Sequence, residues 1–206
     1  MAYVLGFFAA DGYITVNKRG GQFWCIQITD KNLLENIKKI VGAEHKICVR
    51  PRTGNENAQY RLQIGSIEMC DDLRKLGFNE RKTKNLAIPR VPRKYMGHFI
   101  RGYFDGDGNV WAGYIHKKRR VQTMSCLCAF TSCSLNFLKQ LRAELLSFGL
   151  KSGSLYQPKP NCFRLQFSTL DSLKLYDFMY TGIARGNQLC LRRKRVVFEK
   201  FIRLRL

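Results

Sequence analysis

The sequence predicts an α+β fold made of two copies of one αββαββα unit, each with helices on one face of an antiparallel sheet. The first observation is a repeated motif, because VLGFFAADG at residues 4–12 recurs as IRGYFDGDG at residues 100–108. The second is a series of later matches in the same order, namely RLQ at 61–63 and 164–166 and RK at 81–82 and 193–194. The separation of the matches grows along the chain, as insertions in the second copy would produce. We place the copies at residues 1–90 and 95–206.

The first copy alternates between helical and strand periodicity. Residues 3–11 are apolar and helical, and Gly12 is expected to end that helix by reversing the chain. An Asn-Lys-Arg-Gly-Gly turn separates two strand-like runs, and leucine and isoleucine at helical spacing then lead to Gly42, which closes the next helix. The predicted elements are a helix at 3–11, strands at 13–18 and 22–29, a helix at about 33–41, strands at 45–51 and 58–65, and a helix at about 66–76.

The second copy repeats this order and adds a basic C-terminal helix. Its predicted elements are a helix at 96–106, strands at 109–118 and 121–132, a helix at 134–148, strands at 153–158 and 161–168, and a helix at 169–180. The connection between the copies, Ile-Pro-Arg-Val-Pro at 88–92, is short and stiff. We therefore expect the halves to pack as one unit about a pseudo-two-fold axis.

Charge is the strongest feature of the composition. The chain carries 36 Lys and Arg against 15 Asp and Glu, a formal net charge of +21, which is more than solubility requires. A polyanionic partner explains this better, and nucleic acid is favoured over membrane. No run approaches the roughly 20 apolar residues of a membrane span and no secretory signal opens the chain, so a soluble intracellular protein is expected.

Eight cysteines in an intracellular chain indicate thiols or a metal site rather than disulfides. The densest group, Cys126, Cys128 and Cys133, lacks the paired C-x2-C spacing of structural zinc sites. Because Cys126 and Cys128 lie in an apolar, strand-like run, we expect them to be small buried side chains.

Alternation in two strands indicates a polar sheet face. In the RLQI run at 61–64, Arg and Gln point to one side and Leu and Ile to the other, and the RLQF run at 164–167 repeats the pattern. Arg and Gln can bond to guanine and adenine edges in the major groove, although an ordinary solvated face is the alternative. The candidate base-reading residues are Arg61, Gln63, Arg164 and Gln166.

Basic and polar residues also gather at or near the predicted hairpin tips. There they would contact phosphates, which fix the register of a protein on DNA without reading its sequence. These candidates are Asn17, Lys18, Arg19, Arg50, Arg52, Lys117, Lys118, Arg120 and Lys159.

The acidic stretch in the second motif resembles a calcium loop only in part. Asp105, Asp107 and Asn109 fit its first ligand positions. Val110 stands where such a loop needs Gly, and His116 stands where it needs Glu. The calcium-loop interpretation is therefore disfavoured.

The repeat supports a different role for the acids. Both motif helices carry small residues on one face, so two such helices can pack with their backbones close together. Packing across a pseudo-two-fold axis would bring Asp11 and Asp107 together at the helix ends. Two carboxylates so close would repel unless divalent cations lay between them, and Mg²⁺ held by carboxylates and phosphate oxygens is a usual arrangement for phosphodiester cleavage.

These motifs resemble those of the LAGLIDADG homing endonucleases in their single-chain, two-repeat form. RKTKNLAIPRVPRKYMGHFIRGYFDGDGNV at 81–110 also resembles the family's connection between halves, and LKLYDFMYTGIARGNQLCLRRKRVVFEKF at 173–201 resembles its C-terminal part. The resemblance covers nearly the whole chain. It implies an intron-encoded, site-specific endonuclease whose sheets form a saddle on a long double-stranded DNA target. Mg²⁺-dependent hydrolysis would cut each strand once and leave short 3′ overhangs.

The resemblance also implies partners and a setting. Ca²⁺ would be able to occupy the metal sites without supporting cleavage. The protein would act as a monomer on DNA, with no membrane and no small-molecule substrate. It would work with the genome that hosts its intron, in a bacterial or archaeal cytoplasm or in an organelle.

Residue roles follow from matching the motifs. The resemblance implies that Asp11 and Asp107 bind the metal, with main-chain carbonyls near Ala10 and Gly106 as further ligands. Asp105 stands where the first copy has an alanine, so we expect it to cap a helix or lie in the helix interface.

A basic residue near the end of each repeat usually stabilises the transition state in this family. Lys82 and Lys194 match each other across the repeats and are the catalytic candidates; Arg192 is a rival and otherwise a DNA contact. The alternative is that these side chains only touch phosphate. Thr29-Asp30 and Thr131-Ser132 occupy the place of a polar residue that often orients the attacking water.

A non-cleaving DNA- or RNA-binding protein on the same fold, or an intron-splicing maturase, is the alternative function. Loss of either motif aspartate would favour it. Both are present, so the sequence favours the endonuclease.

Overall fold

The computed structural model describes residues 1–51, 54, 57–80, 82–116, 120–151, 153–183 and 189–205. The chain divides into two compact units. Unit 1 comprises Met1–Lys82, Pro89–Gly106 and Gly186–Cys190, and unit 2 comprises Thr83–Ile88, Asp107–Arg185 and Leu191–Leu206. Most of the second motif helix therefore belongs to unit 1, so the compact units and the sequence repeats are different divisions of the chain.

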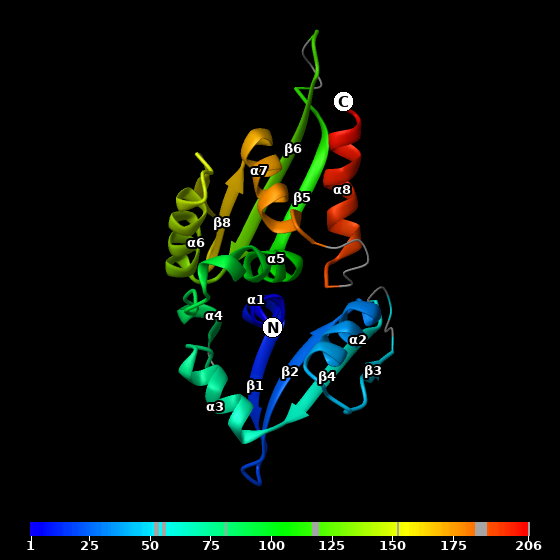
Figure 1. The fold of residues 1–206 in the computed structure, drawn as a ribbon, viewed down its shortest axis with the longest axis vertical. Coiled ribbons are helices and arrows are strands. Elements are labelled where there is room, and N and C mark those ends of the chain that lie inside the picture. The colour runs from blue at the N-terminus through cyan, green and yellow to red at the C-terminus, as the bar shows by residue number, and fades with distance from the viewer. Residues whose placement is uncertain are drawn as a thin grey trace. The chain divides into compact units, whose positions relative to one another are not determined.

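Unit 1 contains the first αββαββα series, as the periodicity predicts. Its elements are α1 (Ala2–Asp11), β1 (Gly12–Val16), β2 (Gln22–Ile28), α2 (Lys31–Ile40), β3 (Cys48–Arg50), β4 (Gln59–Gly65) and α3 (Ile67–Lys75). The strands form one antiparallel sheet in the order β1-β2-β4-β3 (Figure 1). Between the two series lie α4 (Lys82–Asn85), the 3-10 turn η1 (Arg93–Tyr95) and α5 (Met96–Asp107).

Unit 2 contains the rest of the second series, whose first helix is α5. Its elements are β5 (Gly108–Ile115), β6 (Thr123–Ser132), α6 (Leu135–Ser147), β7 (Ser154–Lys159), β8 (Cys162–Phe167), α7 (Thr169–Tyr180) and α8 (Arg192–Arg203). The sheet has the order β5-β6-β8-β7, so the strand topology of the first sheet is repeated. Helices α6 and α7 contact β6, and α8 contacts β5 (Figure 1).

Side-chain caps fix where several helices begin. The Asp30 carboxylate accepts from the Leu33 main-chain N–H at 2.9 Å at the start of α2. Ser66 caps α3 and Ser134 caps α6 in the same way. Each cap satisfies a main-chain donor that has no partner inside its helix.

The helix-covered face of the first sheet forms the core of unit 1. Alternate strand residues are buried there, including Ile14, Trp24, Ile26, Leu62 and Ile64. The Phe8 ring of α1 meets the rings of Trp24 and Phe78 edge to face, with centroids 6.1 and 5.6 Å apart. The predicted alternation of the RLQI run is confirmed.

Some predicted boundaries and one backbone conformation are wrong. Gly12 does not reverse the chain, because its φ of −87° and ψ of 159° are extended and it begins β1 directly. A Cβ at this position would lie 2.1 Å from the Phe8 ring, so glycine is needed here for space. The third strand is shorter than the predicted 45–51, and α4 and η1 were not predicted.

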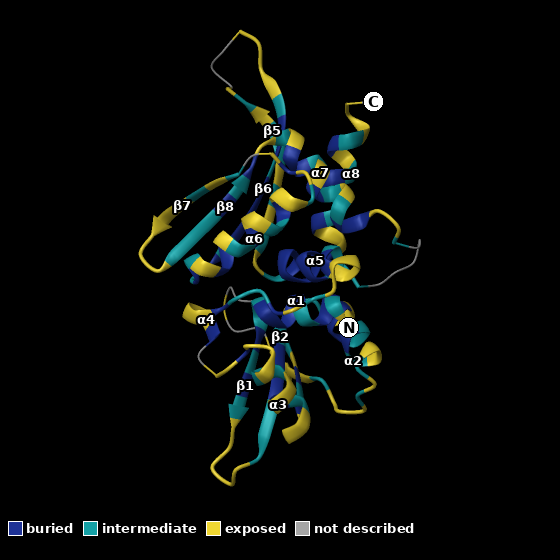
Figure 2. Ribbon diagram, turned by 60° about the vertical axis from the view of Figure 1, so that its left-hand side comes forward, coloured by how far each residue is buried: buried dark blue, intermediate teal, exposed yellow. Residues whose placement is uncertain are grey.

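In unit 1, the backbones of α1 and of residues 96–106 of α5 approach each other closely at Gly6 and Gly102. A Cβ added at Gly6 would lie 1.9 Å from the Phe99 carbonyl oxygen, and one added at Gly102 would lie 2.1 Å from the Tyr3 carbonyl oxygen. The neighbouring atoms belong to main chain and cannot rotate away. Figure 2 shows both helices as largely buried. The predicted close packing of small residues is confirmed within unit 1.

Gly102→Ala is expected to lower the free energy of unfolding by about 2 kcal/mol, because the added methyl overlaps the α1 backbone. This loss should appear although alanine in a helix normally gains about 1 kcal/mol over glycine. Urea unfolding followed by circular dichroism measures it. Gly65→Ala is the control, since the nearest atom to its added carbon would be in the Phe23 ring, at 3.1 Å, and the nearest main-chain atom would be 3.9 Å away. Equal or smaller destabilisation by Gly102→Ala would contradict the packing argument.

Candidate active site and nucleic-acid interface

The uncovered face of the first sheet carries the predicted base-reading residues. Strand register pairs Gln63 with Cys25 and Arg61 with Gln27, so these four side chains share one face. Arg61 is exposed, whereas Leu62 between them is 0% exposed on the opposite face. The structure therefore brings Arg61 and Gln63 onto an open polar surface.

Tyr13 in β1 lies on the same face as Arg61 of β4, with strand β2 between them. The interaction with the Tyr13 hydroxyl raises the pKa of the Arg61 guanidinium. Burial raises the pKa of Tyr13, so the phenol stays protonated at neutral pH. Gln27 and Gln59 also hydrogen-bond to each other on this face. Tyr13, Gln27 and Gln59 were not among the predicted site residues, although period-2 alternation through β1 and β2 could have indicated the first two.

The uncovered face of the second sheet is built similarly. Arg164 pairs with Thr131 and Gln166 with Ala129 across β6 and β8, which places the Arg and Gln on one face. The Tyr156 hydroxyl donates to Gln166 Oε1 at 2.8 Å. Trp111, 42% exposed, was not predicted as part of a site.

The hairpin-tip candidates that the structure describes are on the surface. Asn17 Oδ1 accepts the Arg19 and Gly21 main-chain N–H groups at 2.9 and 2.8 Å, so its side chain shapes the β1–β2 turn. The exposed basic candidates are Lys18, Arg19, Arg50, Arg120, Lys159 and Arg192. The candidates Arg52, Lys117 and Lys118 lie outside the described residues.

Each motif helix ends in the aspartate that the repeat singled out. Asp11 is the last residue of α1 and is half-buried, and Asp107 is the last residue of α5 and is exposed. Within unit 1, a Cβ at Gly106 would lie 3.0 Å from Asp11 Oδ2. The same added carbon would lie 2.4 Å from the Ala10 Cβ, so glycine at 106 is required by the close packing of the two helices near Asp11.

The two candidate catalytic lysines are both buried at these helix ends. Lys82 is 6% exposed, and its Nζ donates to the Ala9 carbonyl at 2.7 Å and lies 3.5 Å from the Ala10 carbonyl. Lys194 is 7% exposed, and its Nζ donates to the Gly108 carbonyl at 2.6 Å. Ala9 and Ala10 lie in the last turn of α1, whose carbonyls carry partial negative charge and stabilise the Lys82 ammonium, whereas Gly108 begins β5 directly after α5.

Asp105 lies inside the helix contact of unit 1, as expected. Its Oδ2 accepts from the Tyr3 hydroxyl at 2.7 Å, and both residues are almost fully buried. Arg101 is 1% exposed, and its guanidinium carbon lies 5.2 Å from the Tyr3 ring centroid. Its Nε donates to the Leu189 carbonyl at 3.2 Å, and its Nη1 donates to His98 Nδ1 at 2.9 Å. Burial lowers the pKa of His98, and the nearby Arg101 guanidinium and N-terminal amine lower it further.

The structure also tests the calcium-loop and cysteine hypotheses. The calcium-loop interpretation is wrong, because Gly108–Ile115 form a strand rather than a loop. Cys126 and Cys128 are fully buried, as expected, and Cys133 is partly buried. Among the residues with described positions, no group of three or more His, Cys, Asp or Glu is arranged to hold a metal ion.

Two of the residues predicted to orient the attacking water, Asp30 and Ser132, accept hydrogen bonds from main-chain N–H groups. Asp30 caps α2 through its carboxylate, and Ser132 Oγ accepts from the Ser134 main-chain N–H at 3.1 Å. Their assignment to water remains a sequence prediction.

A family model, described as a LAGLIDADG-like domain, matches residues 1–77 and again residues 94–177. The chain belongs to this LAGLIDADG-like family. The two matched ranges contain the two motif helices and the two sheets described above, in agreement with the resemblance noted in the sequence.

Two curated proteins are similar in sequence to part of this LAGLIDADG-like chain. One is the probable translation initiation factor IF-2 of Thermococcus kodakarensis, 32% identical over 135 residues, which are 60% of this chain and 10% of that protein. The other is an A-type ATP synthase component of Methanopyrus kandleri, 28% identical over 113 residues, 55% of this chain and 10% of that protein. The chain thus spans about a tenth of these relatives, whose names indicate functions that differ from each other.

Solved structures of LAGLIDADG homing endonucleases share the fold. I-LtrWI bound to target DNA has a TM-score of 0.65 at 13% identity, covering 99% of this chain and 90% of that chain. I-SmaMI bound to cleaved DNA scores 0.64 at 14% identity, covering 98% and 87%. I-AabMI bound to uncleaved DNA scores 0.62 at 16% identity, covering 98% and 88%. At these identities the likeness concerns the fold.

The helices in the described ranges include none with the length and apolar character needed to cross a membrane.

The lowered pKa of His98 predicts an acid-sensitive contact. Below pH 6.5 the unfolded chain binds the proton more readily than the folded one, so the neutral imidazole contributes stability above pH 6.5 that is lost as pH falls through the folded pKa. The melting temperature of His98→Gln should therefore fall less between pH 7 and pH 5 than that of the parent protein. His45→Gln, at an exposed histidine, is the control. Parallel pH profiles for His98→Gln and the parent would contradict the assignment.

Proposed function

We propose that the chain is a site-specific homing endonuclease that hydrolyses one phosphodiester in each strand of double-stranded DNA and leaves short 3′ overhangs. The observation that carries the proposal is the pairing of an aspartate with a buried lysine at the end of each motif helix. Asp11 ends the helix whose carbonyls hold Lys82, and Asp107 directly precedes the Gly108 carbonyl that holds Lys194.

The proposed DNA contacts use the uncovered face of each sheet. Arg61 and Gln63 in the first sheet, and Arg164 and Gln166 in the second, would bind base edges in the major groove. The exposed basic residues near the hairpin tips would bind phosphates and set the register. The net charge of +21 supports a polyanionic partner, and the solved relatives named above are bound to DNA. Because one chain carries both sheets, we propose that a monomer binds the whole target and that its gene lies in an intron.

The residues at the helix ends fit Mg²⁺. Carboxylates are the hard oxygen ligands that this ion prefers, and it commonly takes one or two of them together with substrate phosphates and water. Glycine at 106 keeps a side chain away from the Asp11 carboxylate, because an added Cβ would lie 3.0 Å from its Oδ2. We propose that Asp11 and Asp107 hold the metal, which when bound would activate water and neutralise the phosphate charge.

The chain's own contribution to the reaction would be fixed positive charge. Lys82 and Lys194 are held by main-chain carbonyls, so their ammonium groups would need little reorganisation as negative charge develops on the phosphate. Arginine and lysine side chains on the uncovered faces would hold the DNA so that the scissile phosphates lie at the helix ends. Burial of both ammonium groups supports this role over that of ordinary surface phosphate contacts.

Asp11→Asn and Asp107→Asn should each reduce double-strand cleavage at least about 100-fold, because the amide keeps the shape of the carboxylate but not its charge for the metal. DNA binding, measured by gel shift in Ca²⁺, should change by less than about threefold. Asp177→Asn, at an exposed position of α7, is the control and should cut normally. Undiminished cutting by both motif variants would refute the proposal, and binding without cutting by the parent protein would support the non-cleaving alternative.

A further inference from the structure

We infer that Arg74 is a positioning residue for the first active site: through Glu80 it holds the segment that carries Lys82, so that the Lys82 ammonium stays at the C-terminal end of α1. The inference rests on the proposed endonuclease function. Arg74 is distant in sequence from both motifs, and no pattern in the sequence assigns it a role.

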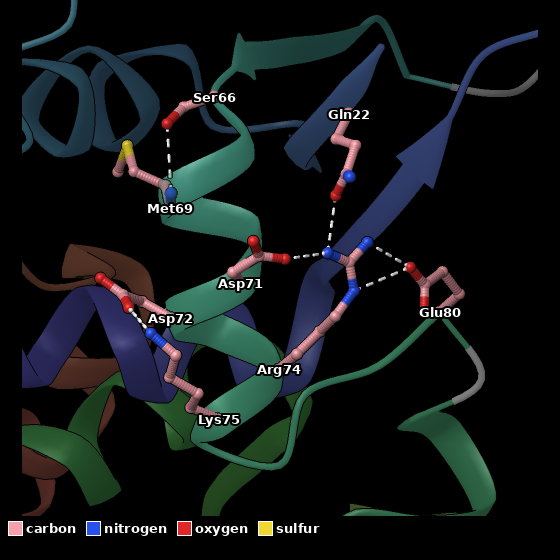
Figure 3. Close-up of polar contacts among 8 residues, drawn as sticks. All are labelled: Gln22, Ser66, Met69, Asp71, Asp72, Arg74, Lys75 and Glu80. Carbon is pink, nitrogen blue, oxygen red and sulfur yellow. Dashed lines mark hydrogen bonds and ion pairs between the residues drawn. The ribbon is translucent and has the colours of Figure 1, made fainter. Parts of the chain in front are cut away.

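The Arg74 guanidinium joins three parts of unit 1 (Figure 3). Its Nη1 donates to Gln22 Oε1 at 2.6 Å at the start of β2 and to Asp71 Oδ1 at 2.7 Å on α3. Its Nε and Nη2 both donate to Glu80 Oε1, at 3.2 and 2.6 Å. A planar guanidinium can hold several acceptors in fixed directions at once, whereas a lysine in its place would provide a single point charge.

Glu80 transmits this position to Lys82 over a short piece of chain. Just before it, the buried Phe78 ring packs against Phe8 of α1. Just after it, the Lys82 main-chain N–H donates to the Asn79 carbonyl at 3.2 Å, and its Nζ reaches the Ala9 carbonyl at 2.7 Å. Two residues span at most about 7 Å, so the position of Glu80 limits how far the Lys82 backbone can lie from it.

The geometry favours a positioning role over a stabilising one. The side chains of Arg74 and Glu80 are 28% and 42% exposed, and exposed ion pairs contribute little to folding free energy. The hydrogen bond from Arg74 nevertheless lowers the pKa of Glu80, so the carboxylate stays ionised and the contact is retained at neutral pH. Removing the contact should therefore shift the segment more than it destabilises the fold.

The second lysine is fixed in a different way. Lys194 lies in the first turn of α8, a 12-residue helix whose Phe198 and Phe201 are fully buried, and its main-chain N–H donates to the Leu191 carbonyl at 3.0 Å. A whole helix packed into unit 2 holds it in place. Loss of Arg74 is therefore expected to impair only one of the two sites.

The test compares Arg74→Gln with Lys75→Gln. Lys75 is the adjacent residue of α3, has its own ion pair with Asp72 at 3.0 Å and is 76% exposed, so it matches Arg74 in charge and helix position but not in contact with the Lys82 segment. The first readout needs no cleavage: lysine acetylation followed by peptide mass spectrometry. Arg74→Gln should raise the labelling rate of Lys82 severalfold and leave Lys194 unchanged, whereas Lys75→Gln should change neither.

The second readout is cleavage of a supercoiled plasmid in Mg²⁺. Arg74→Gln should accumulate nicked circles because one strand is cut about tenfold more slowly or worse, while the other strand is cut at the normal rate. Arg74→Lys should fall between Arg74→Gln and the parent. The charge exchange Arg74→Glu with Glu80→Arg should restore part of the linear product.

The outcomes separate the two proposals. Unchanged Lys82 labelling in Arg74→Gln would overturn the inference, and so would an equal slowing of both strands accompanied by a fall in melting temperature. If the parent protein does not cut DNA at all, the proposed function fails. The acetylation rate of Lys82 relative to Lys194, compared between Arg74→Gln and the parent, still decides whether Arg74 positions Lys82.

Discussion

The backbones of α1 and residues 96–106 of α5 touch directly, and the rest of unit 1 depends on that contact. Gly6 and Gly102 leave less space than a single methyl group requires. Because the two helices pack so closely, residues at the contact are either small or, if polar, have hydrogen-bond partners there. Tyr3 and Asp105 are such a pair, joined by a buried hydrogen bond. The same contact fixes the end of α1, where Asp11 lies, so the close packing of glycines is also a constraint on the candidate site.

The structure also buries basic side chains. Lys82, Lys194 and Arg101 are each at least nine-tenths buried, and each donates to a main-chain carbonyl. A buried cation normally needs compensation. The Ala9 carbonyl in the last turn of α1 supplies part of it to Lys82, because the helix dipole is negative there, and the Gly108 carbonyl at the start of β5 accepts from Lys194. The two ammonium groups are thereby held at carbonyls close in sequence to the motif aspartates, Ala9 before Asp11 and Gly108 after Asp107.

Much of the fold was predictable because the sequence contains two copies of the same pattern. The glycine-rich motifs predicted close helix packing, and alternation in the RLQ runs predicted which sheet faces are open. The structure bears out both predictions. The contacts between Tyr13 and Arg61 and between Arg74 and Glu80 were not predictable, since they depend on the register of strands that are not consecutive and on a loop folding back against a helix. Gly12 was misassigned for a related reason, because the Phe8 ring that requires it is a packing neighbour rather than a turn signal.

The central proposal is that the chain is a site-specific DNA endonuclease that uses both motif aspartates for cleavage and both sheets for binding. The most direct measurement is selection of cleaved molecules from a randomised duplex library in Mg²⁺, followed by sequencing of both cut ends. The account predicts one long consensus, cut once in each strand at a fixed stagger that leaves short 3′ overhangs. Cleavage without a consensus, or ends whose stagger varies from molecule to molecule, would contradict it.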